Sequence, residues 1–330
     1  MSTDFDIVGI GNAIMDVIVP MPDELLDTLH IERGATTLVE EPRAITLYQS
    51  FRETGAPITE VAGGSGANTL VGLAHLGLRT GFIGKVADDT LGAVFASGMQ
   101  AAGVRYNTPP LVGAEKTARC LIAVTPDGER SMSTFLGASV CFSEDDIDAD
   151  MIKAGRILYL EGYLYDRPEA KAAFMKAASI AKAAGRKVAL TLSDGFCVDR
   201  HRKDFQRLVD NSVDIVFANE AELLSLYQSP DFDTALTQLS RCCPVVCVTR
   251  SAKGSVIVAD GHRHDIPRVA VSNIVDTTGA GDQYAAGILA GYALGLSWPD
   301  AGHLGSQCAS NVIAHYGARP DLLKHHLETV

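Results

Sequence analysis

Short apolar runs of strand length alternate along the chain with stretches of helical period, such as Asn68 to Leu76 and Ala170 to Ala184. The apolar runs are Phe5 to Ile10, Thr80 to Ile83, Ile157 to Leu160, Val188 to Leu192, Val213 to Phe217 and Val245 to Thr249. This alternation favours an α/β fold, with a mostly parallel central sheet and helices on both of its faces. Ligands of such sheets bind beyond the carboxyl ends of the strands, so we expect the functional residues there.

Two regions break the alternation. Thr117 to Leu136 contains two strand-like runs joined by a Pro-Asp-Gly turn, which indicates a hairpin. Val17 to Pro20 and Ala35 to Val39 are further extended candidates that no helix follows. We predict that they form a small β lid over the active-site end of the sheet, from segments within about 15–40 and 105–138. The alternative is that they are additional strands of the main sheet.

Length and charge narrow the classes of function. The 330 residues suit one large α/β domain, and no linker divides the chain, so we treat 1–330 as a single domain. Lys and Arg number 28 against 40 Asp and Glu, a net charge of −12. Such a surface repels nucleic acid and anionic lipid, which favours small-molecule chemistry. The number of chains that assemble is left open.

Cysteine usage and the N-terminus indicate a cytoplasmic protein. The seven cysteines are an odd number and show neither a CxxC pair nor zinc-ligand spacing. The start of the chain, MSTDFDIVGIG, carries an acid where a signal peptide would carry Lys or Arg. The longest apolar stretch, Tyr284 to Leu296, is too short to span a bilayer.

The motif DTTGAGD, Asp276 to Asp282, opens a long amphipathic pattern and therefore predicts a helix N-terminus. The first N–H groups of a helix lack intrahelical partners and suit a phosphate, which Gly279 and Gly281 would allow to come close. A carboxylate at that place is repelled by phosphate unless it takes a proton from an attacking hydroxyl, the role we expect for Asp282. The alternative is an ordinary helix start with an acidic first turn.

The motif GIGNAIMD, Gly9 to Asp16, follows the first predicted strand. Ile14 stands where a dinucleotide-binding fingerprint needs a third small residue, which argues against a dehydrogenase. Asn12 and Asp16 remain as polar groups that suit the vicinal hydroxyls of a sugar. Alternatively, Asp16 only ends a turn.

The run GGSGANTLVGLAHLG places three glycines and Ser65 before a predicted helix. Gly63 and Gly64 would let a ligand lie against bare backbone. Asn68, in the first turn, can offer both a donor and an acceptor to a hydroxyl group. A glycine cluster before a helix is weak support unless other motifs accompany it.

Asn219 and Glu222 follow the strand candidate that ends at Phe217. An Asn with a Glu three residues later is a capping box, which requires no ligand. In a protein that handles phosphates, the same pair can hold Mg²⁺ through water. Both interpretations stay open on the residues alone. No GxxxxGK motif followed by Ser or Thr occurs, so a P-loop is excluded.

Taken in order, GNAIMD, GGSGAN, the alternating core, NEAE and DTTGAGD resemble the ribokinase-like (PfkB) family of carbohydrate and nucleoside kinases. The resemblance covers nearly the whole chain. Within this family the chain is similar to the adenosine kinases, chiefly through GIGNAIMD and through ERSMSTFLGAS, Glu129 to Ser139.

The resemblance implies a role for each motif residue. Asp282 matches the base that activates the acceptor's 5′-hydroxyl for attack on the γ-phosphate of ATP. The family's anion hole is matched in this chain by Gly279, Ala280 and Gly281. The ribose-binding positions match Asp16, Gly63, Gly64 and Asn68, with Asn12 and Ser65 close by. The Mg²⁺ and phosphate motif matches Asn219 and Glu222, which favours the functional interpretation of that pair. The nucleotide contacts match Thr249 and Gly254, although Ser251 replaces the usual glycine between them.

We therefore expect a cytoplasmic, Mg²⁺- and ATP-dependent kinase that makes AMP from adenosine, with K⁺ as a possible further cofactor. Apolar lid residues would suit a flat purine; the candidates are Ile14, Cys120 and Phe135. The lid arginines Arg119 and Arg130 could swing toward the phosphates, but we favour a solvated surface position for each. The alternatives are a family kinase for ribose, fructose or a keto-deoxy sugar acid, and a nucleoside-binding regulator without turnover.

Overall fold

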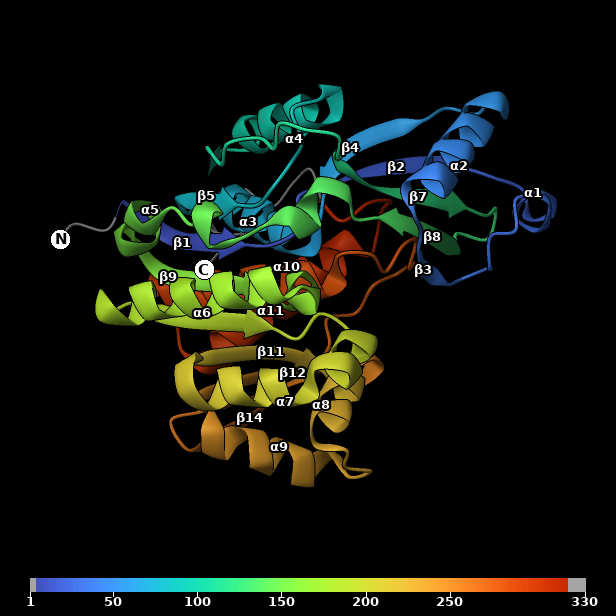
Figure 1. The fold of residues 1–330 in the computed structure, drawn as a ribbon. Helices are drawn as coiled ribbons and strands as arrows, with labels where there is room; N and C mark the ends of the chain where they lie inside the picture. Colours follow the sequence, from blue (N-terminus) through green and yellow to red (C-terminus); the bar gives the residue numbers. More distant parts are fainter. Residues whose placement is uncertain (1–3, 320–330) are drawn as a thin grey trace.

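A computed structural model describes residues 4–319, which form two β-sheets with flanking helices (Figure 1). Within this range the main sheet has nine strands in the order β14-β13-β12-β11-β10-β9-β1-β5-β6. They are β1 (Phe5–Ile10), β5 (Thr80–Ile83), β6 (Val104–Tyr106), β9 (Gly155–Glu161), β10 (Lys187–Thr191), β11 (Ile215–Asn219), β12 (Val245–Thr249), β13 (Ser255–Ala259) and β14 (His262–Ile266). All neighbours from β6 to β12 pair in parallel, and β13 and β14 extend that edge antiparallel. The predicted fold class is confirmed.

Helices cover both faces of the main sheet, and a hydrophobic core lies on each side. One face is covered by α5 (Ala149–Ala154), α6 (Pro168–Ala183), α7 (Gly195–Ser212), α8 (Glu220–Tyr227) and α9 (Phe232–Cys242). The other face is covered by α3 (Ser65–His75), α4 (Thr90–Ala101), α10 (Ala280–Leu294) and α11 (Trp298–Val312). Because the strands are buried on both faces, they appear in the sequence as continuous apolar runs.

The second sheet has five strands in the order β3-β8-β7-β2-β4. They are β2 (Ile14–Pro20), β3 (Thr36–Leu38), β4 (Thr59–Gly63), β7 (Ala118–Val124) and β8 (Arg130–Phe135). The predicted hairpin is present as β7 and β8, which pair antiparallel. This sheet is separate from the main one, so the alternative of additional main-sheet strands is wrong. Its edge strand β4 lies outside both segments assigned to the lid, and β6 joins the main sheet.

Two helices, α1 (Asp23–Thr28) and α2 (Glu41–Glu53), cover one face of the second sheet. Side chains of a strand alternate between faces. In β2, Val17 and Val19 therefore pack toward these helices, whereas Ile14, Asp16 and Ile18 lie on the opposite face. The sheet thus presents Asp16 on the face that the helices leave free.

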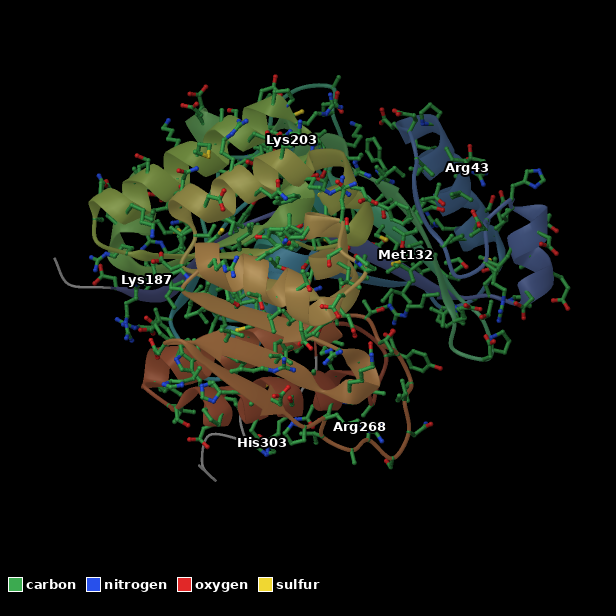
Figure 2. All side chains as sticks on the ribbon, turned by 90° about the horizontal axis from the view of Figure 1, so that it is seen from below. Arg43, Met132, Lys187, Lys203, Arg268 and His303 are labelled. Carbon is green, nitrogen blue, oxygen red and sulfur yellow. The ribbon has the colours of Figure 1, made fainter. Side chains whose placement is uncertain are left out.

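The second sheet lies at the carboxyl ends of the parallel strands. Lys187, at the start of β10, lies at one end of the molecule, and Met132 of β8 lies toward the other (Figure 2). Short 3-10 helices connect the elements at η1 (Gly137–Cys141), η2 (Glu144–Asp146), η3 (Gly162–Asp166) and η4 (Ser251–Lys253). None of the helices in residues 4–319 has the length and apolar character needed to cross a membrane.

Candidate active site

The motif DTTGAGD begins α10, as the sequence predicts. Gly279 is the N-cap residue and has φ +76°, a left-handed conformation that glycine adopts without strain. A Cβ at Gly279 would also lie 2.7 Å from the backbone of Ala318. The fold itself therefore accounts for this glycine.

The start of α10 leaves backbone N–H groups open. The N–H of Ala280 donates to the carbonyl oxygen of Thr277 at 3.2 Å. Within residues 4–319 no acceptor is found for the N–H groups of Gly281 and Asp282. A Cβ at Gly281 would meet no atom within 4 Å, so packing does not require a glycine there. Open space and free N–H groups at a helix N-terminus are what a phosphate needs.

Two groups from the start of α3 hold the carboxylate of Asp282. The hydroxyl of Ser65 donates to Oδ1 at 2.6 Å, and Nδ2 of Asn68 donates to Oδ2 at 3.3 Å. Burial raises the pKa of Asp282 to about 6, although these hydrogen bonds and the charge of Arg319 act in the opposite direction. The two motifs, more than 200 residues apart in the sequence, thus form one site.

Asp16 on β2 is a second carboxylate of the candidate site. The pairing of β2 with β4 brings it beside Gly63. Burial raises the pKa of Asp16 to about 6, and its charge interacts with those of Arg319, Arg130 and Asp282. A Cβ at Gly63 would collide with the carboxylate of Asp16. The glycine therefore allows Asp16 to approach β4.

Gly64 has φ +91°, and a Cβ there would collide with the carbonyl oxygen of Asn12. We expected Gly63 and Gly64 to expose bare backbone to a ligand. Their small size also lets Asn12, which lies between β1 and β2, and Asp16 on β2 approach the end of β4 and the start of α3. Contact of the two glycines with a ligand stays a prediction. The glycines shape the pocket by bringing its polar side chains together.

Glu161 is not among the predicted site residues, but it lies under this pocket at the end of β9 and is 1% exposed. Its carboxylate accepts from Nδ2 of Asn12 at 3.1 Å and from the N–H of Gly66 at 2.6 Å. Burial raises the pKa of Glu161 to about 7. Oδ1 of Asn12 has no partner within the described range, so this buried amide has a free acceptor. The sequence feature that could have indicated Glu161 is its position directly after the apolar run Ile157 to Leu160.

Arg319 was also missed, because it lies far from every motif in the sequence. Its Nε donates to Oδ1 of Asn68 at 2.7 Å. Burial lowers the pKa of Arg319 to about 10, and the charges of Asp16 and Asp282 oppose that shift. The guanidinium group therefore stays charged at neutral pH, beside two carboxylates.

The two arginines of the predicted lid are not simply solvated. Arg130 forms a buried ion pair with Asp276, so the expected surface position is wrong. Arg119 is partly buried, and its guanidinium group lies 5.8 Å from the ring centroid of Tyr48 on α2. This contact places Arg119 on the helix-covered face of the second sheet.

The apolar candidates for the acceptor pocket divide between the two faces of the second sheet. Ile14 and Cys120 pack together on the face that carries Asp16. Phe135 packs with Leu47 and Phe51 of α2 on the opposite face, so its expected place in the pocket is wrong. Phe135 pairs in register with Arg119, the position before Cys120 on β7, so it lies on the face opposite to Cys120.

The remaining site candidates lie at the ends of β11 and β12, where Asn219 and Thr249 are partners in register. Gly254 has φ +81°, and a Cβ there would collide with the carbonyl oxygen of Ile266. The hairpin thus accounts for Gly254 without a ligand. Partial burial and the carboxylates of Asp194, Glu222 and Asp282 raise the pKa of Tyr163.

Comparison with known proteins agrees with this architecture. Residues 42–325 match the pfkB family carbohydrate kinases. The chain belongs to the pfkB family. It is therefore a phosphotransferase of the carbohydrate and nucleoside kinase type, and the family implies the use of ATP, typically with Mg²⁺. This membership argues against a regulator without turnover.

Similar proteins differ in the substrates that their names give, and the first two below have solved structures. The adenosine kinase from Sinorhizobium meliloti is 45% identical, with a TM-score of 0.91 over 98% of each chain. A probable sugar kinase from Rhizobium etli CFN 42 is 43% identical, with a TM-score of 0.91 over 100% of this chain and 99% of its own. The 5-dehydro-2-deoxygluconokinase of Shouchella clausii is 27% identical over 95% of this chain and 91% of its own.

In this pfkB kinase, Asn219 and Glu222 form the complete capping box of α8. Nδ2 of Asn219 donates to Oε1 of Glu222 at 2.6 Å, and the backbone N–H of Asn219 donates to Oε2 at 2.9 Å. Burial raises the pKa of Glu222 to about 7. Direct metal coordination does not fit a carboxylate used in this way, but contact through water does.

Within residues 4–319 no group of three His, Cys, Asp or Glu side chains could hold a metal ion. Mg²⁺ characteristically keeps several waters and binds through one or two carboxylates together with substrate phosphates. The residues of this kinase would therefore suit a Mg²⁺ ion that arrives with the nucleotide, and Glu222 would be the residue to hold it through water.

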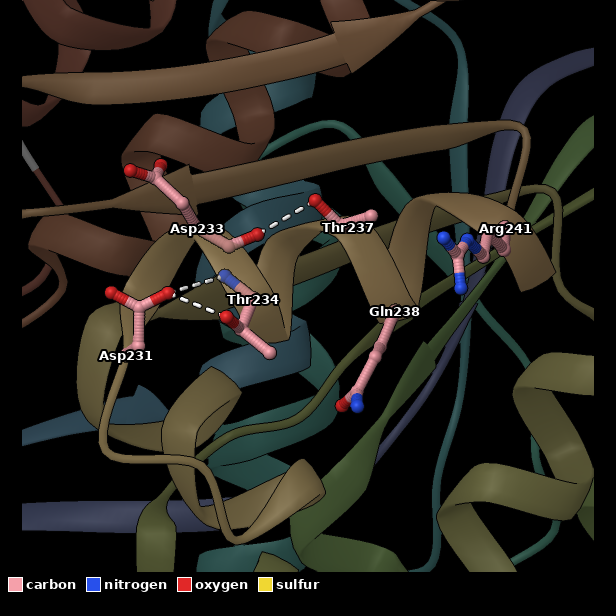
Figure 3. Close-up of a pocket in the computed structure, with 6 residues that line it drawn as sticks. All are labelled: Asp231, Asp233, Thr234, Thr237, Gln238 and Arg241. Atoms are coloured by element: carbon pink, nitrogen blue, oxygen red, sulfur yellow. Dashed lines mark hydrogen bonds between the residues drawn. The ribbon is translucent and has the colours of Figure 1, made fainter.

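A surface hollow over α9 is separate from this site (Figure 3). Its lining residues are Asp231, Asp233, Thr234, Thr237, Gln238 and Arg241. Asp231 accepts from the N–H and the hydroxyl of Thr234, which caps the helix. All its lining residues belong to α9 or directly precede it, and none of the site candidates is among them.

Proposed function

We propose that this pfkB kinase transfers the γ-phosphoryl group of ATP to the 5′-hydroxyl of adenosine and so makes AMP, a purine-salvage reaction. The observation that carries the proposal is the position of Asp282, held by Ser65 and Asn68 beside the free N–H groups of α10. As general base, Asp282 takes the hydroxyl proton as the oxygen attacks. The anion hole of Gly279, Ala280 and Gly281 stabilises the charge on the transferred group.

The acceptor pocket is assigned to Asp16 and Asn68, with Asn12, Gly63, Gly64 and Ser65 around them. The carboxylate of Asp16 and the amide of Asn68 suit the two ribose hydroxyls. Ile14 and Cys120, on the same face as Asp16, offer an apolar surface to a flat base. The second sheet, acting as a lid, would close over the acceptor and exclude water, which limits wasteful ATP hydrolysis.

The nucleotide end of the site is assigned to the carboxyl ends of β11 and β12. Thr249 and Gly254 contact the nucleotide, and Asn219 and Glu222 act on its phosphates through hydrated Mg²⁺. Positioning and charge stabilisation are the main demands of phosphoryl transfer. One helix N-terminus, one cation and one acid meet these demands.

The charges around the pocket support a neutral acceptor. Arg319 interacts with Asp16 and Asp282, and Arg130 pairs with Asp276. The cations beside the pocket are thus matched by carboxylates of the protein itself. A sugar acid would bring a further carboxylate beside these two already matched cations, at a considerable desolvation cost. The likeness to the Sinorhizobium meliloti adenosine kinase supports the same choice.

A kinase for a sugar such as ribose or fructose is the alternative, and the likeness to the Rhizobium etli probable sugar kinase favours it. An ADP-release assay decides between the two. Purified protein with Mg²⁺ and ATP is tested against adenosine, inosine, ribose, fructose and 5-dehydro-2-deoxygluconate, with Asp282→Asn as the control for contaminating kinases. We expect the highest kcat/KM with adenosine. A clear preference for a sugar would overturn the adenosine assignment and leave the family unaffected.

The same assay tests the ion requirements. Chelation of Mg²⁺ should abolish ADP release, and replacement of KCl by an equal concentration of NaCl tests whether K⁺ assists the anion hole. Restored activity with K⁺ alone would support a monovalent-ion site.

A further inference from the structure

Arg319 reaches the candidate active site from the far end of the described chain. Its Nε donates to Oδ1 of Asn68 at 2.7 Å, and its terminal nitrogen lies 3.8 Å from the sulfur of Met99 on α4. The side chain thus packs between the start of α3 and α4. It ends beside the groups that hold Asp282.

The segment just before Arg319 is tied to the glycine motif. The N–H of Gly317 donates to Oδ2 of Asp276 at 2.8 Å. The carbonyl oxygen of Ala318 accepts from Nε2 of Gln283 at 3.0 Å. Backbone atoms of Ala318 also pack closely against Gly279. The two preceding residues therefore anchor Arg319, and its position depends on that of the glycine motif DTTGAGD.

The hydrogen bond from Arg319 determines which way the amide of Asn68 faces. An amide has an oxygen and a nitrogen of similar shape, and the surrounding partners decide their orientation. Arg319 can only donate, so it requires the oxygen on its side. The NH₂ group of Asn68 is then directed at Oδ2 of Asp282, 3.3 Å away. A reversed amide would place oxygen against carboxylate.

The charge of Arg319 also acts directly on the carboxylates. It favours the ionised forms of both Asp282 and Asp16. Within residues 4–319, the other titratable groups whose charges interact with that of Asp282 are Asp16 on β2, Tyr159 and Glu161 on β9, and Tyr163 on η3. When ionised, each of these groups is an anion. Among the described residues, Arg319 is thus the cation whose charge acts on Asp282 and opposes these anions.

We propose that Arg319 is a positioning residue for the phosphoryl transfer: it orients the amide of Asn68 toward Asp282 and supplies the positive charge that keeps this carboxylate ionised. The inference rests on the proposed role of Asp282 as general base. It assigns a function in the kinase site to the segment after α11, which the sequence motifs do not reach.

The test compares Arg319→Gln and Arg319→Lys with Arg207→Gln, a control on α7 whose side chain is 70% exposed. We expect Arg319→Gln to lower kcat on the order of 10- to 100-fold through misalignment of the base. In the pH profile of kcat/KM for this variant, the acidic limb should shift to higher pH by roughly one unit. Arg319→Lys should restore the position of the limb. If kcat falls but the acidic limb stays at the same pH, Arg319 only supports the structure of the site, and the proposal is overturned.

A second measurement separates this inference from the proposed function. In the background of Asn68→Ala, a further change of Arg319→Gln should lower kcat much less than it does alone, because the amide it orients is gone. The carboxyl ¹³C titration of Asp282, followed by NMR in the free protein, requires no turnover. An upward shift in Arg319→Gln supports the charge effect even if adenosine is not the acceptor. An unchanged titration would contradict it.

Discussion

Arg130 of β8 and Asp276 of the loop before α10 form an ion pair in which both side chains are almost fully buried, 6% and 2% exposed. The carboxylate of Asp276 also accepts from the N–H groups of Thr278 and Gly317, at 3.0 and 2.8 Å. One buried carboxylate therefore connects the second sheet, the glycine motif and the segment that carries Arg319.

Because of this arrangement, Arg130→Met should destabilise the protein by about 3–5 kcal/mol, since it leaves the carboxylate of Asp276 buried without its cation. Urea unfolding measures the change. Arg207→Met, which removes an exposed ion pair on α7, is the control and should cost less than about 1 kcal/mol. Adding Asp276→Asn to Arg130→Met should cost less than the sum of the two single changes. Equal effects of Arg130→Met and the control would show that the pair contributes little.

Replacement of Asp282 by Asn should leave the fold intact and lower kcat by roughly 10²- to 10⁴-fold, the contribution of a general base. The amide keeps an oxygen that can accept from Ser65 or Asn68, so the melting temperature should change little. Asp150→Asn is the matched control, because the side chain of Asp150 is 95% exposed on α5. Wild-type turnover in Asp282→Asn would remove the assigned mechanism.

The pH dependence of activity should follow the raised pKa of Asp282, which is about 6. The base acts in its ionised form, so kcat/KM for the acceptor should rise as pH increases through about 6 and level off above it. Asp16 has a similar pKa and interacts with Asp282. The apparent pKa of this rise in kcat/KM therefore describes the two carboxylates together. The measurement uses ATP and Mg²⁺ at saturation. A limb near the usual carboxylate value of about 4 would contradict a base held in this buried site.

The parts of this site that the sequence reveals are those formed locally. A helix start after a glycine turn, as at Gly279, is encoded within a few neighbouring residues, and so is the capping box of Asn219 and Glu222. The buried parallel strands could likewise be predicted, because burial on both faces leaves continuous apolar runs.

The partners contributed by distant segments could not be predicted. Glu161 reaches the site because β9 lies beside β1 in the sheet, and no residue near it in the sequence indicates that neighbour. The same holds for Arg319, whose partner Asn68 is 251 residues away. Phe135 was misplaced because its face depends on strand alternation relative to α2, which composition does not reveal.

Glu161 should make stability depend on pH. Its pKa is about 7 in the folded protein, against an ordinary value of 4.5, so the folded state retains a proton that the unfolded state releases. The contribution is fully present below about 4.5 and is lost as pH rises through about 7, which corresponds to roughly 3 kcal/mol across this window. In Glu161→Gln the side chain does not titrate. The unfolding free energy of the wild type, relative to that variant, should fall between about pH 5 and about pH 8. A constant difference would mean that Glu161 is not protonated in the folded state.

The two glycines of the anion hole should respond in opposite ways to alanine. Gly279→Ala places a side chain at φ +76° and against Ala318, so it should destabilise the protein by about 1–3 kcal/mol. Gly281→Ala meets no atom within 4 Å, and alanine favours helix, so its melting temperature should equal or exceed that of the wild type. Its methyl group would nevertheless occupy the space assigned to the phosphate. We therefore expect a folded protein with a raised KM for ATP and a lowered kcat, measured by ADP release beside thermal melts. Full activity in Gly281→Ala would show that the transferred phosphate does not approach this turn of α10.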